Sequence, residues 1–417
     1  MTELKPIVPN PGSERNPRNF VGRSETTSDA MDKLNAKQNI LLSDPRRMGK
    51  TFWMQTFAEH LNASNQYKAI FVDYQGVDST EEFLTKTARE LWKYRSLPSK
   101  FMKRLEALFD NVDVKVSVKA LELKKAVRSS QKPPIAIMED LLKQFDDDLA
   151  DDKKEVPLVV FMDEVTDAVL SIARKGGETE ANNLLQRLRH LRGSTGNIRW
   201  ILAGSIGFHH VRTAIKASDD IVNDLDPLKF GPLAYSDARQ LAQRLALGID
   251  RPIVKEAIES VVAMTDAFPS LIHKLFDMMK RHDGDGRSAA GSTIDAAEVK
   301  QRLGRLIDDA DQSRDVTHFV TRIDKYYGQN TDMAFKILDY MAQIPDWTPF
   351  HVLKAAMLKT AMKDESVSEF RQNMFAAAFN NLCDDHYLIE QKTDSSLNVA
   401  WRYGILKTIY RRRRRLD

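Results

Sequence analysis

A Gly-Lys-Thr triplet at residues 49–51 ends the segment Ser43 to Thr51, which directly follows the apolar run 40–42. Where a strand ends in a tight turn and a helix begins, several backbone N–H groups converge on one point and favour an anion. The segment matches the phosphate-binding pattern G-x-x-x-x-G-K-[ST] except at the first position, where Asp44 replaces glycine. The pattern therefore predicts a nucleoside triphosphate with Mg²⁺ as the ligand.

The same pattern predicts a role for individual side chains. We expect Lys50 to reach the β- and γ-phosphates and the Thr51 hydroxyl to bind the metal ion. Asp44 tolerates left-handed backbone angles better than most residues, so the turn remains possible, and Arg46 and Arg47 are expected to offset its charge. The alternative is a basic turn between strand and helix. The residues predicted to bind the nucleotide here are Pro45, Arg46, Arg47, Met48, Gly49, Lys50, Thr51 and Phe52.

Two acidic residues end a second apolar run, which reads V-P-L-V-V-F-M-D-E from Val156 to Glu164. A continuous apolar run is typical of a strand buried on both faces of a parallel sheet. Ligands of such sheets bind at the carboxyl ends of the strands. We expect Asp163 to hold Mg²⁺, through water, as the partner of Thr51, and Glu164 to orient the water that attacks the γ-phosphate. The alternative, a solvated strand end, is disfavoured by the upstream Gly-Lys-Thr loop.

A third strand is predicted from Asn197 to Ser205. Its last residue, Ser205, is the candidate to contact the γ-phosphate or the attacking water. The alternative is that residues 204–207 form only a tight turn before the next helix.

These motifs, in this order, resemble those of the archaeal-type ATPases, which are related to the STAND and NACHT branch of the AAA+ P-loop NTPases. The resemblance covers about residues 18–310, and further matching pieces are Phe20 to Arg23, Asp226 to Leu233 and Thr265 to Leu271. It implies that Phe20 and Arg23 lie near the adenine, and that a C-terminal winged helix follows the ATPase.

The sequence departs from this family pattern at Asp44 and at Ala267, which stands where the first glycine of Gly-x-Pro is expected. It also has no obvious arginine finger, so hydrolysis without a partner is expected to be slow. Arg189, Arg192 and Arg212 are the candidates for a finger supplied to a neighbouring subunit. The alternative for each is an exposed basic helix face.

The predicted fold is an α/β P-loop NTPase, a parallel sheet flanked by helices, followed by an α-helical lid and a winged-helix domain. The expected divisions are a polar arm (1–19), the ATPase domain (20–233, with an insert at 96–155), the lid (234–312) and the winged helix with a basic C-terminal tail (313–417). Within the insert, strict alternation over Val112 to Val118 predicts a half-exposed strand.

Composition limits the class of protein. The chain has 417 residues, 42% of them hydrophobic, so it can bury a large core and form more than one domain. No stretch approaches the ~20 apolar residues of a membrane span. The first residues lack an apolar signal core, and the single cysteine, Cys383, excludes internal disulfides, so a cytoplasmic location is expected.

The net charge of +3 argues against a protein coated in basic surface, so any contact with nucleic acid must be local. Such a contact is offered by the run Arg411 to Arg415, which suits a polyanion. The same run suits a helix C-terminus or a partner-facing tail.

Three functions are therefore open. The first is an ATP- and Mg²⁺-dependent ATPase that acts as a conformational or assembly switch, with a partner protein or by self-association. The second is a DNA-binding winged-helix protein whose ATP site controls assembly. The third is a nucleotide-binding scaffold that hydrolyses poorly because of Asp44.

Overall fold

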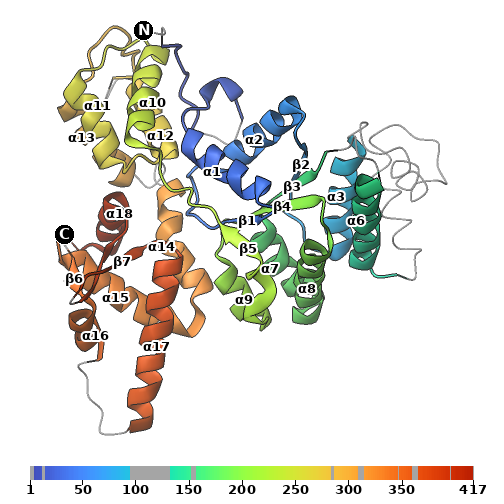
Figure 1. Ribbon diagram of the computed structural model, residues 1–417. Helices are drawn as coiled ribbons and strands as arrows, with labels where there is room; N and C mark the ends of the chain where they lie inside the picture. The colour runs from blue at the N-terminus through green and yellow to red at the C-terminus, as the bar shows by residue number, and fades with distance from the viewer. Residues whose placement is uncertain are drawn as a thin grey trace. The chain divides into compact units, whose positions relative to one another are not determined.

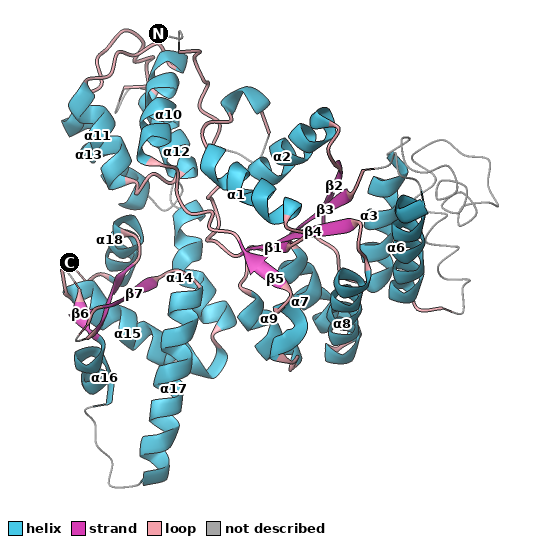
Figure 2. Ribbon diagram, in the orientation of Figure 1, coloured by secondary structure: helices cyan, strands magenta, loops and turns pink. Residues whose placement is uncertain are grey.

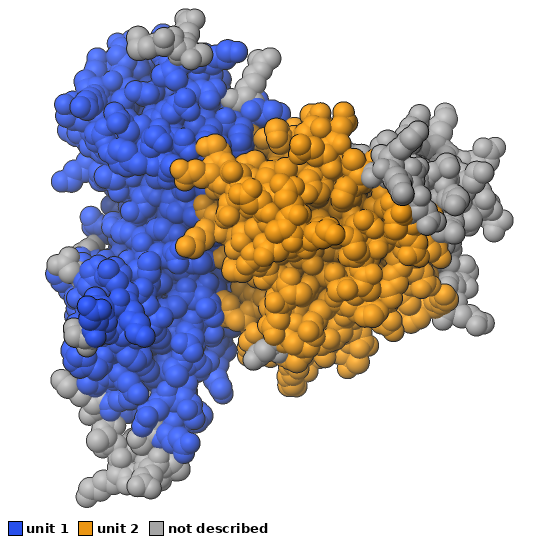
Figure 3. Space-filling view, viewed as in Figure 1, with its two compact units in different colours: residues 1–23, 44–49, 231–417 blue, residues 24–43, 50–230 orange. Residues whose placement is uncertain are grey.

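The computed structural model describes residues 4–11, 15–93, 132–151, 156–282, 286–308, 314–345, 347–358, 365–394 and 396–416. The strand expected over 112–118 lies outside these residues. The chain divides into two compact units, coloured separately in Figure 3. The first contains Met1–Arg23, Asp44–Gly49 and Gly231–Asp417, and the second contains Ser24–Ser43 and Lys50–Phe230.

The second unit is built on a five-stranded sheet with the order β2-β3-β4-β1-β5. Every neighbouring pair is parallel. All residues of β3 and β4 are buried, which confirms the prediction that these apolar runs are covered on both faces. The strands are β1 (Asn39–Leu42), β2 (Lys68–Asp73), β3 (Leu158–Asp163), β4 (Ile198–Ala203) and β5 (Leu225–Pro227).

Helices cover both faces of this sheet, with α1 and α2 on one side and α7, α8 and α9 on the other (Figures 1 and 2). Aromatic packing fixes α2 on the sheet, because Trp53 stacks on Phe57 at 5.0 Å and Phe57 meets Phe161 of β3 edge-on at 5.8 Å. The helices are α1 (Ser24–Asn35), α2 (Lys50–Ser64), α3 (Thr80–Lys93), α6 (Pro134–Asp151), α7 (Val165–Gly176), α8 (Glu178–Ser194) and α9 (Phe208–Ile215).

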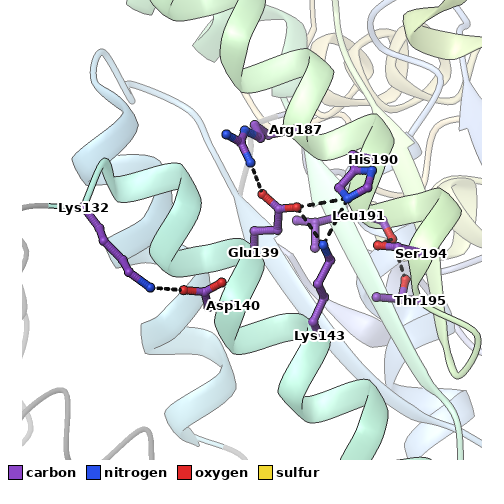
Figure 4. A network of polar contacts seen from close by, with 9 residues as sticks. All are labelled: Lys132, Glu139, Asp140, Lys143, Arg187, His190, Leu191, Ser194 and Thr195. Carbon is purple, nitrogen blue, oxygen red and sulfur yellow. Dashed lines mark hydrogen bonds and ion pairs between the residues drawn. The ribbon is translucent and has the colours of Figure 1, made fainter.

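Polar contacts join α6 to α8 (Figure 4). The buried carboxylate of Glu139 accepts hydrogen bonds from Lys143 at 2.9 Å and from Arg187 at 2.7 Å. Burial alone would raise the pKa of Glu139, but these two cations outweigh it and lower the pKa below its ordinary value. Asp146 of α6 accepts the backbone N–H groups of Gly196 and Asn197, just before β4. The described end of the predicted insert is therefore fastened to the sheet domain.

The first unit is mainly helical. The helices expected within 235–308 are confirmed: α10 (Tyr235–Gly248), α11 (Lys255–Met264), α12 (Pro269–Met279) and α13 (Ala296–Asp308). The remaining helices are α14 (Arg314–Tyr326), α15 (Thr331–Gln343), α16 (Phe350–Leu358), α17 (Glu365–Asp384) and α18 (Gly404–Arg414). A three-stranded antiparallel sheet with the order β6-β8-β7 consists of β6 (Thr348–Pro349), β7 (Leu388–Lys392) and β8 (Leu397–Trp401). None of the described helices is long and apolar enough to cross a membrane.

The arginine run at 411–415 lies at the C-terminal end of α18, one of the placements left open by the sequence. Its first four residues form the last turn of α18, where positive charge is favourable beside the helix dipole. Arg414 bonds Asp339 at 2.9 Å and lies over the Phe335 ring, and Arg413 donates to the Ile307 carbonyl at 3.1 Å. Part of the run is therefore engaged within its own unit.

Residues 4–11, part of the expected polar arm, pack on α10 and α12. Ile7 is buried, and its N–H donates to the Arg244 carbonyl at 2.8 Å. The Asn10 N–H donates to Nδ1 of His273 at 3.2 Å. A Cβ atom on Gly248 would lie 1.8 Å from the Ile7 carbonyl oxygen, so this close approach requires glycine.

This packing predicts a pH-dependent stability. Burial lowers the pKa of His273 from 6.5 to about 4, because the protonated ring loses its hydration. Above pH 6.5 the ring is neutral in both the folded and the unfolded protein, so it does not change the free energy of unfolding. As the pH drops from 6.5 towards 4, the ring is protonated in the unfolded protein but not in the folded one, and the free energy of unfolding falls. At pH 5 the loss should reach about 2 kcal/mol in the free energy of unfolding.

Urea unfolding at pH 7.5 and pH 5 measures this loss. We expect a smaller loss in His273→Gln than in the wild type, and an unchanged loss in His282→Gln, whose side chain is exposed. Equal losses in the wild type and His273→Gln would contradict the assignment.

Candidate functional site

The start of α2 and the end of β3 bring together the residues predicted to bind phosphate and metal. Lys50 begins α2 and is 8% exposed, and Asp163 ends β3 and is 2% exposed. The Thr51 hydroxyl donates to Oδ2 of Asp163 at 2.5 Å. Residues 112 positions apart in the chain thus meet because parallel strands end at one edge of the sheet.

The electrostatics of Asp163 suit a cation. Burial raises its pKa, while the hydrogen bond from Thr51 and the charge of Lys50 lower it. Asp73, its register partner at the end of β2, adds a second negative charge that raises the pKa further. A hydroxyl and a carboxylate beside one another are oxygen donors of the kind that Mg²⁺ prefers. Thr51 and Asp163 therefore fit the metal expected from the sequence.

Glu164, the predicted water-orienting residue, lies between β3 and α7 in a left-handed backbone conformation with φ of 56°. Its Oε2 accepts the N–H of Ser205 at 3.1 Å. The Ser205 hydroxyl donates to Asp167, and Ser205 is 4% exposed. Burial, then the hydrogen bond and the charge of Asp167, raise the pKa of Glu164 to about 7. The structure thus places Glu164 and Ser205, two of the three residues predicted to be catalytic together with Lys50, in one cluster.

Asp167 is the residue of this cluster that the sequence reasoning missed. Its position three residues after Glu164, which directly precedes α7, was the available signal, because a residue in the first turn of a helix lies close to the residue before the helix. The sequence reasoning also missed that the packing of β4 against α7 requires a glycine at position 204. A Cβ atom there would lie 2.1 Å from Oγ1 of the buried Thr166, so glycine permits the close approach of the end of β4 to α7.

The phosphate-loop residues Asp44–Gly49 belong to the first unit and are followed directly by Lys50. Left-handed angles occur at Arg47, with φ of 73°, and at Gly49, with φ of 86°. Asp44 lies outside the left-handed region, so the turn does not depend on its tolerance of such angles. Within the loop Pro45 and Met48 are buried, while Arg46, Arg47 and Gly49 are exposed.

Arg23, predicted to lie near the adenine, bonds backbone carbonyls of its own unit. Its guanidinium donates to Met48 at 2.8 Å and to Pro232 at 3.1 Å. Burial lowers its pKa to about 10, although Asp44 and Asp237 favour its charge. Phe20 and Phe52 are half-buried. Contact of Phe20, Arg23 and Phe52 with a nucleotide stays a prediction.

Two of the arginine-finger candidates have local partners in the second unit. Arg192 is buried, and its guanidinium donates to Asp224 at 2.6 Å and to the Ile221 carbonyl at 2.7 Å. It is therefore a structural residue and not an exposed finger. Arg189 bonds Asp220, and Arg212 lies half-buried on α9.

No family model matches this chain, and no curated protein matches it. Among solved structures, a Walker-type ATPase of Pyrococcus abyssi aligns with a TM-score of 0.58 and 16% identity, over 98% of this chain and 99% of that one. The ORC2 protein of Aeropyrum pernix, in ADPNP and ADP complexes, aligns with a TM-score of 0.49 and 11% identity, over 97% and 98% of the chains. The likeness to the first of these structures shows that the chain has the fold of a Walker-type ATPase over nearly its whole length. The predicted α/β fold class is confirmed.

Proposed function

We propose that this protein binds ATP with Mg²⁺ and hydrolyses it, and that it acts as a nucleotide-controlled switch with a partner protein or another copy of itself. We place it with the archaeal-type ATPases of the STAND and NACHT-related branch. The observation that carries the proposal is the convergence of Lys50, Thr51 and Asp163 next to Glu164 and Ser205. These side chains come from three separate segments and supply a cation, metal donors and a carboxylate.

In this proposal each residue has one task. The backbone of residues 45–49 and the Lys50 ammonium bind and neutralise the phosphates. Thr51 and Asp163 hold Mg²⁺, which supplies positive charge to the phosphate oxygens when bound. Glu164 orients the attacking water, and Ser205 fixes the carboxylate of Glu164 through its N–H. Catalysis of this type works mainly through positioning and charge neutralisation.

Slow hydrolysis by the isolated chain follows from the same cluster. The Glu164 carboxyl group also shares a hydrogen bond with the Asp167 side chain, and this bond must be released before the oxygen that makes it can bind a water. Arg192 is bonded to Asp224 and therefore does not serve as an arginine finger. We propose that a partner or a second copy supplies the missing positive charge.

Isothermal titration of Mg²⁺ and ATP into folded, nucleotide-free protein tests the proposal. We expect saturable binding that needs Mg²⁺, accompanied by slow phosphate release. A complete lack of ATP and GTP uptake would contradict it.

The second candidate is DNA binding, with α15 to α17 and the β7–β8 hairpin as a winged helix and Arg411 to Arg415 on phosphate. The third helix of such a domain can enter the major groove. However, α17 carries Glu365, Glu369 and Asp384 against Arg371 as its one basic residue. This balance disfavours a phosphate-lined groove and favours a protein partner for α17, so the arginine run is the stronger DNA candidate.

A salt-dependent DNA-binding assay separates the two candidates. If the arginine run binds DNA, replacing the exposed Arg412 and Arg415 with glutamine should weaken binding and flatten the salt dependence. If the protein is a switch without DNA contact, the wild type itself will show no saturable DNA binding.

A further inference from the structure

Asp44 departs from the phosphate-loop pattern, and its side chain has a specific partner. Its Oδ1 accepts the backbone N–H of Gly231 at 3.1 Å, a hydrogen bond between residues 187 positions apart. Gly231 has a φ of +55° and lies shortly before α10, which begins at Tyr235. Both residues belong to the first unit.

A second bridge runs beside the first. Arg23 donates from one guanidinium nitrogen to the Met48 carbonyl in the loop and from another to the Pro232 carbonyl, next to Gly231. The charges of Asp44 and Arg23 attract one another. The two side chains therefore join the phosphate loop to residues 231–232 at two adjacent points, one with an acceptor and one with donors.

The segment after these points leads into the helical region. The Leu233 N–H donates to the Ala267 carbonyl at 3.1 Å, immediately before α12. Asp266 in turn accepts the Ile405 N–H at 2.6 Å, at the start of α18. A short series of hydrogen bonds thus runs from the phosphate loop through residues 231–233 to α12 and α18.

Glycine at position 44 would remove the first link. Because Asp44 is not in the left-handed region, the backbone does not need glycine there. A glycine would leave the Gly231 N–H without this acceptor and would add backbone freedom to the loop.

We propose that Asp44 is a positioning residue which, with Arg23, fastens the phosphate loop to Gly231 and couples nucleotide binding to the conformation of residues 231–237. The inference rests on the proposed function, since it concerns the regulation of the same site. In this proposal Asp44, which stands where the phosphate-binding pattern has its first glycine, connects the loop to the helices of the lid (234–312).

Three variants test this coupling: Asp44→Gly, which restores the pattern, Asp44→Asn, which keeps an acceptor oxygen, and Arg23→Lys, which keeps the charge but replaces the two guanidinium nitrogens that bond Pro232 and Met48 with a single nitrogen atom. We expect Asp44→Gly to bind Mg²⁺ and ATP about five- to tenfold more weakly, the effect of one lost hydrogen bond plus added loop freedom. Arg23→Lys should weaken binding similarly, and Asp44→Asn should stay within about twofold of the wild type. Melting curves verify that each variant is folded.

Amide hydrogen exchange of residues 231–237, with and without ATP, provides a second measurement. We expect ATP to protect this segment in the wild type and in Asp44→Asn, and to protect it less in Asp44→Gly.

Different failures lead to different conclusions. If the wild type binds ATP and Asp44→Gly binds it as tightly or more tightly, the coupling is overturned and the proposed function stands. Equal weakening in Asp44→Asn would also overturn it, because the amide retains the acceptor. If the wild type does not bind ATP, the proposed function fails and the coupling fails with it.

Discussion

Replacing Lys50 with alanine is expected to weaken the binding of Mg²⁺ and ATP by about a hundredfold or more and to abolish phosphate release. The reason is that a lysine ammonium makes charge-assisted hydrogen bonds to phosphate oxygens, each contributing about 1.5–3 kcal/mol. Lys50 is 8% exposed, so the surrounding structure holds its side chain at this site. Its charge also favours the ionised form of Asp163, the proposed metal ligand.

Titration calorimetry on Lys50→Ala and on a control, Lys175→Ala, measures this effect. Lys175 lies in the same unit and pairs with Asp78 through a side chain that is 64% exposed. The control should bind ATP like the wild type, and both variants should melt as cooperative proteins. Wild-type affinity in folded Lys50→Ala would show that the predicted phosphate loop does not bind nucleotide through this residue.

Replacing Glu164 with glutamine is expected to preserve ATP binding within a few-fold while lowering the rate of phosphate release by about 10²- to 10⁴-fold, the range for loss of a general base. Glutamine keeps an oxygen that can accept the Ser205 N–H, so the local structure should persist. Only the carboxylate that orients and polarises water is lost.

The control for Glu164→Gln is Glu178→Gln, which alters an exposed ion pair with Lys216 in the same unit. Its rate should match the wild type. An unchanged rate in Glu164→Gln would exclude Glu164 as the water-orienting residue, while a loss of ATP binding would instead assign it to ligand binding.

The same residue predicts how the rate depends on pH. Burial and Asp167 raise the pKa of Glu164 to about 7, so the protonated, inactive form accumulates below neutrality. The rate should therefore fall as the pH drops below about 7. Asp167→Asn removes a neighbouring negative charge, so this fall should move to lower pH. A rate that is flat between pH 6 and pH 8 in the wild type would contradict the assignment.

Local patterns in the sequence were sufficient to predict the strands and the helix that carry the site. The apolar runs that became β3 and β4 are continuous because both faces are covered, and this burial is visible in composition alone. The start of α2 at Lys50 follows from the Gly-Lys-Thr triplet, and an α-helical region was expected after the sheet, where the structure has α10 to α13. Since parallel strands end at one edge of a sheet, the meeting of Thr51 with Asp163 was also predictable.

Only the tertiary structure showed which hydrogen-bond partner each polar side chain has. Asp44 bonds Gly231 and Arg192 bonds Asp224 across long stretches of chain, and no local period encodes such pairs. Ile7 lies in a segment that is polar by composition, yet α10 offers it a carbonyl and an apolar surface. The sequence left the arginine run open between a helix C-terminus and a tail, and in the structure Arg411 to Arg414 belong to α18. Sequence patterns thus determined the elements and the chemistry at their ends, because both depend on near neighbours, whereas pairing between distant side chains depends on how the chain folds back on itself.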